Sequence, residues 1–144
     1  MSVLVKTILE QKGRDVVTVA PNATLAEAAR ILEQNRIGAV VVVGMESRIV
    51  GIFTERDLVT AIGRRGPECL NEPVSSAMTT NVFRCGEEAT VNELMEMMTA
   101  RRFRHVPVES NGRLAGIISI GDVVKNRIRE IELEAEQIKA YIAG

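Results

Sequence analysis

Two short motifs place a hydroxyl three residues before a carboxylate, Thr54-x-x-Asp57 and Ser119-x-x-Asp122. Each motif follows an apolar stretch and precedes a helical pattern, so we expect it where a strand passes into a helix. A helix N-terminus offers free N–H groups to anions, and a carboxylate there can accept both hydroxyls of a cis-diol such as ribose. The simpler interpretation is a helix cap, worth about 1 kcal/mol. The spacing alone favours the cap.

A basic cluster, Arg101-Arg102-Phe103-Arg104-His105, comes directly before the apolar segment Val106-Pro107-Val108. Arg101 and Arg102 agree with a solvated helix end, where the helix dipole favours cations. Arg104 and His105 agree poorly with that interpretation because they adjoin a segment that we expect to be buried. An arginine fork and a histidine that titrates near neutral pH are both suited to binding phosphate. The cluster is therefore a second candidate for ligand binding.

Composition restricts the other possibilities. The chain of 144 residues has 18 Lys and Arg against 19 Asp and Glu, so it lacks the strongly basic character of proteins that bind nucleic acid or anionic membranes. Cys69 and Cys85 form no CxxC pair and His105 is the single histidine, which excludes the usual Cys/His zinc sites. The longest apolar run, Ala39–Val43, is too short to span a membrane, and no signal peptide is recognisable. We therefore expect a soluble, cytoplasmic protein with reduced thiols.

The chain contains an internal repeat. Thr24-Leu25-Ala26-Glu27 recurs 66 positions later as Thr90-Val91-Asn92-Glu93, and Asp57 recurs 65 positions later as Asp122. The single lost residue falls in a turn, where duplicated folds tolerate deletions best. We assign residues 1–66 to the first repeat with its N-terminal segment, 67–127 to the second repeat, and 128–144 to a C-terminal helical extension.

Both repeats predict the same β-α-β-β-α order. A capping box, Thr24…Glu27 or Thr90…Glu93, opens the first helix, and the turn Ser110-Asn111-Gly112 predicts a hairpin. The expected strands are 16–19, 39–43 and 49–53 in the first repeat, and 82–85, 106–109 and 114–118 in the second. One such repeat cannot bury both faces of its sheet. We therefore expect an α/β (α+β) fold in which the repeats pack about a pseudo-two-fold axis and leave two equivalent clefts.

These residues resemble the cystathionine-β-synthase (CBS) domain pair, also called a Bateman module. The matching segments are Val16–Thr24, Arg36–Val40 and Gly51–Asp57 in the first repeat, and Arg104–Val108 and Gly116–Asp122 in the second. The resemblance covers about residues 3–130. It implies a regulatory module that binds adenosine-containing ligands between the repeats and often forms dimers.

The resemblance also implies two clefts, each completed by the other repeat. It assigns the Asp of each motif to the ribose, and Arg104 and His105 to the phosphates, whereas the matching positions of the first repeat, Gly38 and Ala39, are uncharged. Phe83 and Val17 would lie beside the adenine, although both are equally suited to a plain core. The first cleft would contain Ile52, Phe53, Thr54 and Asp57 with Phe83, Arg104 and His105. The second would contain Ile118, Ser119 and Asp122 with Val17, Gly38 and Ala39, and either Arg56 or Arg104 would reach the phosphate there.

The C-terminal segment carries apolar residues at alternating spacings of four and three, which are the spacings of a coiled-coil heptad. A helix packed on its own domain is the alternative. The residues concerned are Val124, Ile128, Ile131, Ala135, Ile138 and Ile142. We expect a long helix there that contributes to a homodimer.

Three functions agree with these features to different degrees. The first is a regulatory CBS pair, standing alone, that binds AMP, ADP, ATP or NAD(H) and controls a partner protein; the basic cluster makes S-adenosylmethionine a weaker candidate. The second is a dimeric interaction scaffold that needs no ligand. The third is an enzyme such as a nucleotide hydrolase, for which the sequence offers no P-loop and no cluster of metal-binding carboxylates. Both Asp residues and both hydroxyls favour the first, with no catalytic cofactor or metal.

Overall fold

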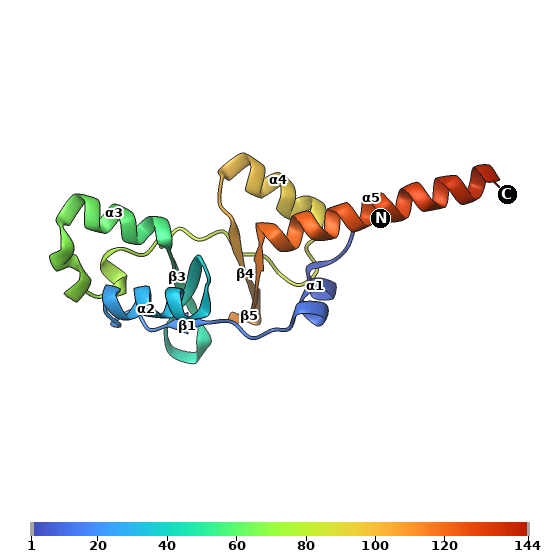
Figure 1. Ribbon diagram of the computed structural model, residues 1–144. Coiled ribbons are helices and arrows are strands. Elements are labelled where there is room, and N and C mark those ends of the chain that lie inside the picture. Colours follow the sequence, from blue (N-terminus) through green and yellow to red (C-terminus); the bar gives the residue numbers. More distant parts are fainter. Residues whose placement is uncertain (1, 144) are drawn as a thin grey trace. The chain divides into compact units, whose positions relative to one another are not determined.

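The computed structural model describes residues 2–143 and is a mixed α+β fold with a long C-terminal helix, as the sequence predicts (Figure 1). The first repeat contains β1 (Thr18–Val19), α2 (Leu25–Asn35), β2 (Ala39–Val43), β3 (Ile49–Thr54) and α3 (Glu55–Arg65). The second contains α4 (Val91–Arg101), β4 (His105–Ser110), β5 (Arg113–Ser119) and α5 (Ile120–Ala143). A further helix, α1 (Val5–Lys12), precedes both repeats, and the 3-10 helices η1 (Met45–Ser47), η2 (Pro67–Asn71) and η3 (Val74–Ser76) lie in connections.

These elements form two compact units that do not follow the order of the chain. The first-repeat unit comprises residues 15–83 and 110–115. The second-repeat unit comprises residues 2–14, 84–109 and 116–143 of the described chain. The N-terminal segment thus groups with the second repeat, which lies more than 70 residues further along the chain.

The first-repeat unit contains a three-stranded sheet in the order β1-β2-β3. β1 pairs with β2 in parallel, and β2 pairs with β3 antiparallel, so that Ala39 lies opposite Thr54. The central strand β2 is almost wholly buried, which agrees with its run of four valines because a strand covered on both faces is apolar throughout. The core joins this sheet to α2 through fully buried side chains: Leu25, Ala28, Val40, Val42, Phe53 and Val74.

Among the described residues of the second repeat, only β4 and β5 form an extended ladder, so the predicted strand over 82–85 is wrong apart from one residue. Cys85 makes a single parallel bridge: its N–H donates to the Pro107 carbonyl at 3.1 Å, and its carbonyl accepts the Glu109 N–H at 2.8 Å. Pro107 takes the place of Val41, whose N–H extends the matching ladder of the first repeat. Because proline has no N–H, the ladder cannot continue past it.

The predicted capping boxes are confirmed at the start of α2 and of α4. The Thr24 hydroxyl accepts the Glu27 N–H at 3.1 Å, and the Glu27 carboxylate accepts the Thr24 N–H at 3.2 Å. Thr90 and Glu93 make the same pair of bonds at 3.1 and 3.3 Å. The hairpin turn is also confirmed, since Asn111 and Gly112 both adopt positive φ, as the two-residue turns that match strand twist require.

The sequence did not reveal α1, which completes the second-repeat unit. The Val91 N–H donates to the Val3 carbonyl and the Val5 N–H donates to the Ala89 carbonyl, both at 2.8 Å. In the first-repeat unit, the connection after α3 makes the matching bonds, from Leu25 to Glu72 and from Val74 to Ala23, at 2.9 and 2.7 Å. We call residues 3–12 and 72–81 the two covering segments. They are related by 69 positions, and each covers one repeat.

α5 is one continuous helix of 24 residues (Figure 1). Its first half packs in the second-repeat unit, where Val123, Asn126 and Glu130 are buried. The Glu130 carboxylate accepts the Val3 N–H at 2.6 Å and the Arg127 guanidinium at 3.0 Å. Every residue from Ile131 to Ala143 is exposed.

Candidate ligand-binding site

The first strand-to-helix step, at the end of β3, holds Thr54 and Asp57 in a reciprocal cap. The Asp57 N–H donates to the Thr54 hydroxyl oxygen at 3.2 Å. Asp57 Oδ2 accepts both the Thr54 N–H at 2.9 Å and the Thr54 hydroxyl at 3.1 Å. The cap that the spacing favours is therefore present, and it fixes the carboxylate at the N-terminus of α3.

A covering segment adds a further donor to this first step. The Thr79 hydroxyl donates to Asp57 Oδ1 at 3.2 Å. Thr79 is held in place by its backbone, which exchanges two hydrogen bonds of 2.9 Å with Ile52 on β3. Gly51 allows this approach, because a Cβ there would lie 2.9 Å from the Thr79 carbonyl oxygen. The result is a carboxylate surrounded by neutral donors.

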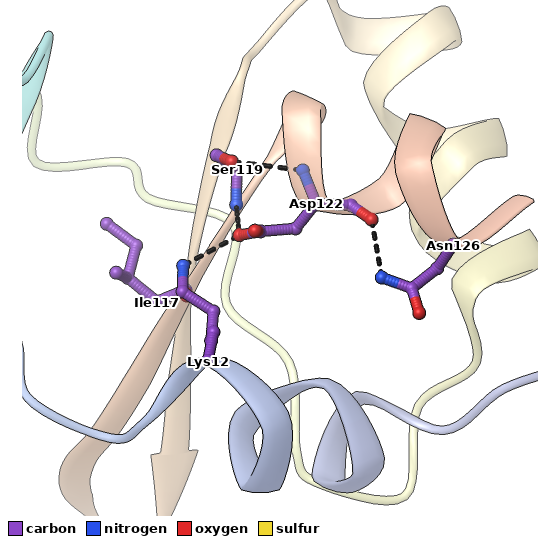
Figure 2. A network of polar contacts seen from close by, with 5 residues as sticks. All are labelled: Lys12, Ile117, Ser119, Asp122 and Asn126. Atoms are coloured by element: carbon purple, nitrogen blue, oxygen red, sulfur yellow. Dashed lines mark hydrogen bonds and ion pairs between the residues drawn. The ribbon is translucent and has the colours of Figure 1, made fainter.

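The second step, at the end of β5, repeats the cap with Ser119 and Asp122 (Figure 2). The Asp122 N–H donates to the Ser119 hydroxyl oxygen at 3.2 Å, and Asp122 Oδ2 accepts the Ser119 N–H at 2.9 Å. Here the covering segment supplies a cation. Lys12 Nζ, at the C-terminal end of α1, lies 2.7 Å from Asp122 Oδ2 and 3.0 Å from the Ile117 carbonyl oxygen. The contacts of this carboxylate with Lys12 and with the Ser119 N–H are both made by Oδ2.

These neighbours change the ionisation of Asp122. Partial burial raises the pKa of this carboxyl, but the hydrogen bonds and charge of Lys12 and the Ser119 amide outweigh burial and lower the pKa below 3.8. The side chains of Lys12 and Asp122 remain 33% and 22% exposed, so water screens part of this attraction. Asp122 is ionised at neutral pH, the state that a ribose diol requires of it.

The other residues predicted for the site are divided between the two units. Gly38 and Ala39 lie beside the first step, since the Gly38 carbonyl accepts the Glu55 N–H at 3.0 Å. Arg104 and His105 lie beside the second step in the corresponding way, since the Arg104 carbonyl accepts the Ile120 N–H at 2.8 Å. Completion of each cleft by residues of the other repeat stays a prediction. Also in the first-repeat unit are Val17, Ile52, Phe53, Arg56 and Phe83; Ile118 belongs to the second-repeat unit.

Burial separates these residues further. The side chains of Phe53 and Ile118 are fully buried in the core and that of Ile52 is 7% exposed, so these positions have mainly backbone groups to offer a ligand. Arg56 and Arg104 are exposed, whereas Val17, Phe83 and His105 are half-buried.

Sequence reasoning missed Thr79 and Lys12, the two residues that complete the steps. Both belong to the covering segments, whose relation is visible in the sequence only as Val5-x-x-x-Leu9 and Val74-x-x-x-Met78. The structure explains this pattern: Leu9 and Met78 are the side chains that a Cβ on Gly116 or Gly51 would meet, at 2.6 and 2.8 Å.

Residues 2–143 offer little support for other kinds of site. Among them, no group of three His, Cys, Asp or Glu side chains is placed so that it could hold a metal ion. Within the same residues, no helix has the length and hydrophobicity needed to cross a membrane. The thiols are poor nucleophiles: Cys69 is buried, and burial together with the charge of Glu93 raises the pKa of Cys85 to about 11.

Comparison with solved structures gives close matches over most of the chain. A CBS-domain-containing protein of Agrobacterium tumefaciens is 58% identical, with a TM-score of 0.83 over 87% of this chain and 99% of that one. A CBS domain protein of Pyrobaculum aerophilum, solved in complex with AMP, is 28% identical, with a TM-score of 0.77 over 92% of this chain and 99% of that one. A CBS domain pair solved with 5′-methylthioadenosine and S-adenosylmethionine is 27% identical, with a TM-score of 0.77 over 87% of this chain and 95% of that one.

Sequence comparisons agree with the structures. An uncharacterised 17.7 kDa protein of Acidianus ambivalens is 40% identical over 111 residues, which span 76% of this chain and 66% of the relative. The family model described as CBS domain matches twice, over residues 6–64 and 74–129. Each match contains one strand-to-helix step. The chain therefore belongs to the CBS-domain family and carries two CBS domains in tandem.

Proposed function

We propose that this chain is a regulatory module that binds adenosine-containing nucleotides at its two strand-to-helix steps. The observation that carries the proposal is the doubled arrangement of a hydroxyl and a carboxyl group at a helix N-terminus. Asp57 Oδ1 has one hydrogen bond from Thr79, and the contacts of Asp122 with Lys12 and the Ser119 N–H are made by Oδ2. Since a carboxylate oxygen can accept two hydrogen bonds, both steps retain capacity for a ribose hydroxyl.

Two related structures support adenosine as the common part of the ligand. One relative is solved with AMP, and another with 5′-methylthioadenosine and S-adenosylmethionine. These ligands share a ribose with a free cis-diol but differ in the group attached to its 5′ carbon. Arg104 and His105 favour a ligand with phosphates, so we propose AMP, ADP, ATP or NAD(H) before S-adenosylmethionine.

In this proposal the ligand acts by changing the shape that the module presents to a partner protein, with no turnover of the nucleotide. The identity of the nucleotide is tested by mass spectrometry of small molecules released from freshly purified, heat-denatured protein. Chromatography of nucleotides incubated with the protein tests the absence of turnover. New hydrolysis products would instead assign the chain an enzymatic activity.

Calorimetry of AMP binding to Asp57→Asn and Asp122→Asn tests the role of the carboxylates. Asparagine can still accept the N-cap N–H, so the helix cap is kept while the charge is lost. A hydrogen bond to a charged group contributes about 1.5–3 kcal/mol, so we expect affinity to fall about 10- to 100-fold at the altered step. Glu27→Gln is the matched control, because it makes the same change in the capping box of α2, away from either step. Unchanged AMP and NAD affinity in both Asp variants would refute the site.

The second candidate is a dimeric scaffold without a ligand. It is favoured by one observation: the caps alone account for the Thr–Asp and Ser–Asp pairs, since every hydroxyl and carboxylate in them is already hydrogen-bonded. The two candidates differ in their response to nucleotide. A scaffold shows no heat of binding and no rise in melting temperature with AMP, ATP, NAD or S-adenosylmethionine.

For both candidates we propose that the chain works as a homodimer. The proposal is supported by the exposed apolar residues of α5, which the sequence already predicts as an association surface.

A further inference from the structure

The last part of α5 is a helix without support from its own chain. From Ile131 to Ala143 every residue is exposed, and the isoleucines at positions 131, 138 and 142 are 50%, 59% and 77% exposed. A lone helical segment of about 12–15 residues is only marginally stable in water. Such a segment with exposed isoleucines is stabilised when these side chains are buried against another surface.

The face that α5 uses within its own unit is not the face that carries the heptad residues. Val123, Asn126 and Glu130 face the second-repeat unit. At 3.6 residues per turn, the heptad residues are centred roughly 130° around the helix from these three. The heptad face, which we call the seam, is therefore free along all of α5. It consists of Val124, Ile128, Ile131, Ala135, Ile138 and Ile142.

The charges that flank the seam indicate what covers it. Taking Ile128, Ala135 and Ile142 as heptad positions a, the e positions are Lys125, Glu132 and Lys139, and the g positions include Arg127 and Glu134. In parallel helices in register, each g residue faces the e residue five positions later on the partner. This alignment pairs Arg127 with Glu132 and Glu134 with Lys139 of the other copy. Both pairs have opposite charges, and all six seam positions meet their counterparts.

Antiparallel alignments satisfy fewer of these requirements. The antiparallel alignment with full overlap places Lys125 opposite Lys139 and Glu134 opposite Glu134 of the partner, which is unfavourable. Shifting it by one heptad in either direction brings opposite charges together, but then two of the six seam positions have no counterpart. We propose that α5 associates with α5 of a second copy of this chain as a parallel, in-register coiled coil along this seam.

This inference rests on the proposed homodimer but is independent of nucleotide binding. It concerns residues outside both strand-to-helix steps. Leu133 is exposed on α5 and occupies the outer position f of this heptad assignment, so it serves as a control position. The seam has fewer than three heptads, and we expect association in the micromolar range rather than tighter.

A charge swap in the full chain tests the orientation. Glu134→Lys alone places two lysines opposite each other in the parallel pair, and we expect it to weaken the dimer at least fivefold in sedimentation equilibrium. The double variant Glu134→Lys/Lys139→Glu makes this pair opposite in charge again in the parallel alignment, so we expect recovery to within about twofold of wild type. In the antiparallel alignment with full overlap, Glu134→Lys exchanges one like-charged pair for another and would not weaken the dimer. A double variant that stays as weak as Glu134→Lys would overturn the parallel orientation.

A disulfide provides an independent measure of register. Ile142→Cys places the two new thiols side by side in the parallel pair, whereas the antiparallel alignments separate them by at least about 16 Å along the helix axis. We expect a covalent dimer of Ile142→Cys in a glutathione buffer and none of Glu136→Cys, whose side chain lies outside the seam. Wild type, with Cys69 buried and Cys85 half-buried, measures the background from the native thiols.

The last experiment distinguishes a dimer that does not use the seam from the absence of any dimer. Ile138→Asp puts a charge into the seam at an exposed position, so the fold is expected to survive, and its melting curve and that of Leu133→Asp check this. We expect Ile138→Asp to weaken the dimer at least tenfold and Leu133→Asp to leave it unchanged. A dimer that Ile138→Asp leaves intact overturns the seam alone. A wild-type chain that is monomeric at 0.1 mM, roughly a hundredfold above a micromolar Kd, overturns both proposals.

Discussion

The two strand-to-helix steps have the same backbone and the same cap but differ in the residue that completes them. At the first step, the completing group is the neutral hydroxyl of Thr79, which donates to Asp57 at 3.2 Å. At the second, it is the ammonium group of Lys12, 2.7 Å from Asp122. Both groups come from the covering segments. The comparison shows that a duplicated site can keep its framework while its electrostatic environment is set by the segment that covers it.

The largest expected difference between the two repeats is the loss of stability when the glycine under each covering segment is changed to alanine. Gly51→Ala brings a Cβ to 2.9 Å from the Thr79 carbonyl oxygen, a backbone atom that also accepts the Ile52 N–H. The three atoms nearest to the Cβ of Gly116→Ala all belong to the side chain of Leu9. Overpacking costs about 1–3 kcal/mol. We expect the free energy of unfolding, measured by urea denaturation, to fall by about 2–3 kcal/mol in Gly51→Ala and by about 1 kcal/mol in Gly116→Ala. Equal losses would show that the two covering segments are held equally firmly.

Ligand binding gives the next difference. Only the first cleft is expected to receive Arg104 and His105, so we predict that its AMP affinity exceeds that of the second by at least tenfold, about 1.4 kcal/mol. In calorimetry, Asp57→Asn then removes the tighter binding phase and Asp122→Asn the weaker one. If Asp122→Asn instead removes the tighter binding phase, Arg104 and His105 bind the phosphate at the second step.

The Lys12–Asp122 pair gives an effect of about 1 kcal/mol or less, because both side chains are partly exposed. The folded pKa of Asp122 is lowered below 3.8, so the pair stabilises the fold above the unfolded pKa and loses this effect as pH falls through the folded value. Lys12→Met should therefore destabilise the protein at pH 7 and have little effect near pH 2. A loss that does not change with pH would mean that Lys12 acts through the packing of its methylenes.

Removing the neutral partner at the first step gives the smallest effect. Thr79→Val keeps the size of the side chain and removes one exposed hydrogen bond, so we expect a loss of about 0.5 kcal/mol. The dependence on salt distinguishes the two steps. The loss in free energy of unfolding caused by Lys12→Met should shrink between 0.05 and 0.5 M NaCl, because the Debye length falls from about 14 to about 4 Å. The loss caused by Thr79→Val should not change with salt. A salt-dependent loss in Thr79→Val would show that the first step is not governed by neutral contacts.

The parts of this fold that depend on local sequence were predictable. The capping boxes at Thr24 and Thr90, the steps at Thr54 and Ser119, and the turn at Asn111 are each specified within four residues. The Thr–Asp and Ser–Asp bonds of the candidate site follow from the same short spacing. The end of the ladder at Pro107 is also a local property, although it becomes visible only when the two repeats are compared position by position.

The parts that depend on distant segments were not predictable. α1 is eight residues long and has only three buried side chains, too few for a clear helical period. Its backbone partners in the second repeat are the carbonyls of Glu87 and Ala89, and nothing near Lys12 in the sequence indicates Asp122. Whether Phe83 and Val17 contact a ligand is likewise not a matter of local sequence, because a half-buried apolar side chain suits a core and an adenine pocket equally well.

The position of α1 has a consequence for how the chain folds during synthesis. The N–H of Val3, just before α1, donates to Glu130, 127 residues later, so this segment is made long before the group that it binds. At roughly 5–20 residues per second, α1 waits roughly 6–25 s for α5 to be made, whereas residues 15–83, the larger part of the first-repeat unit, are made well before α5. During that interval the apolar face of α1 is exposed to chaperones and to other nascent chains.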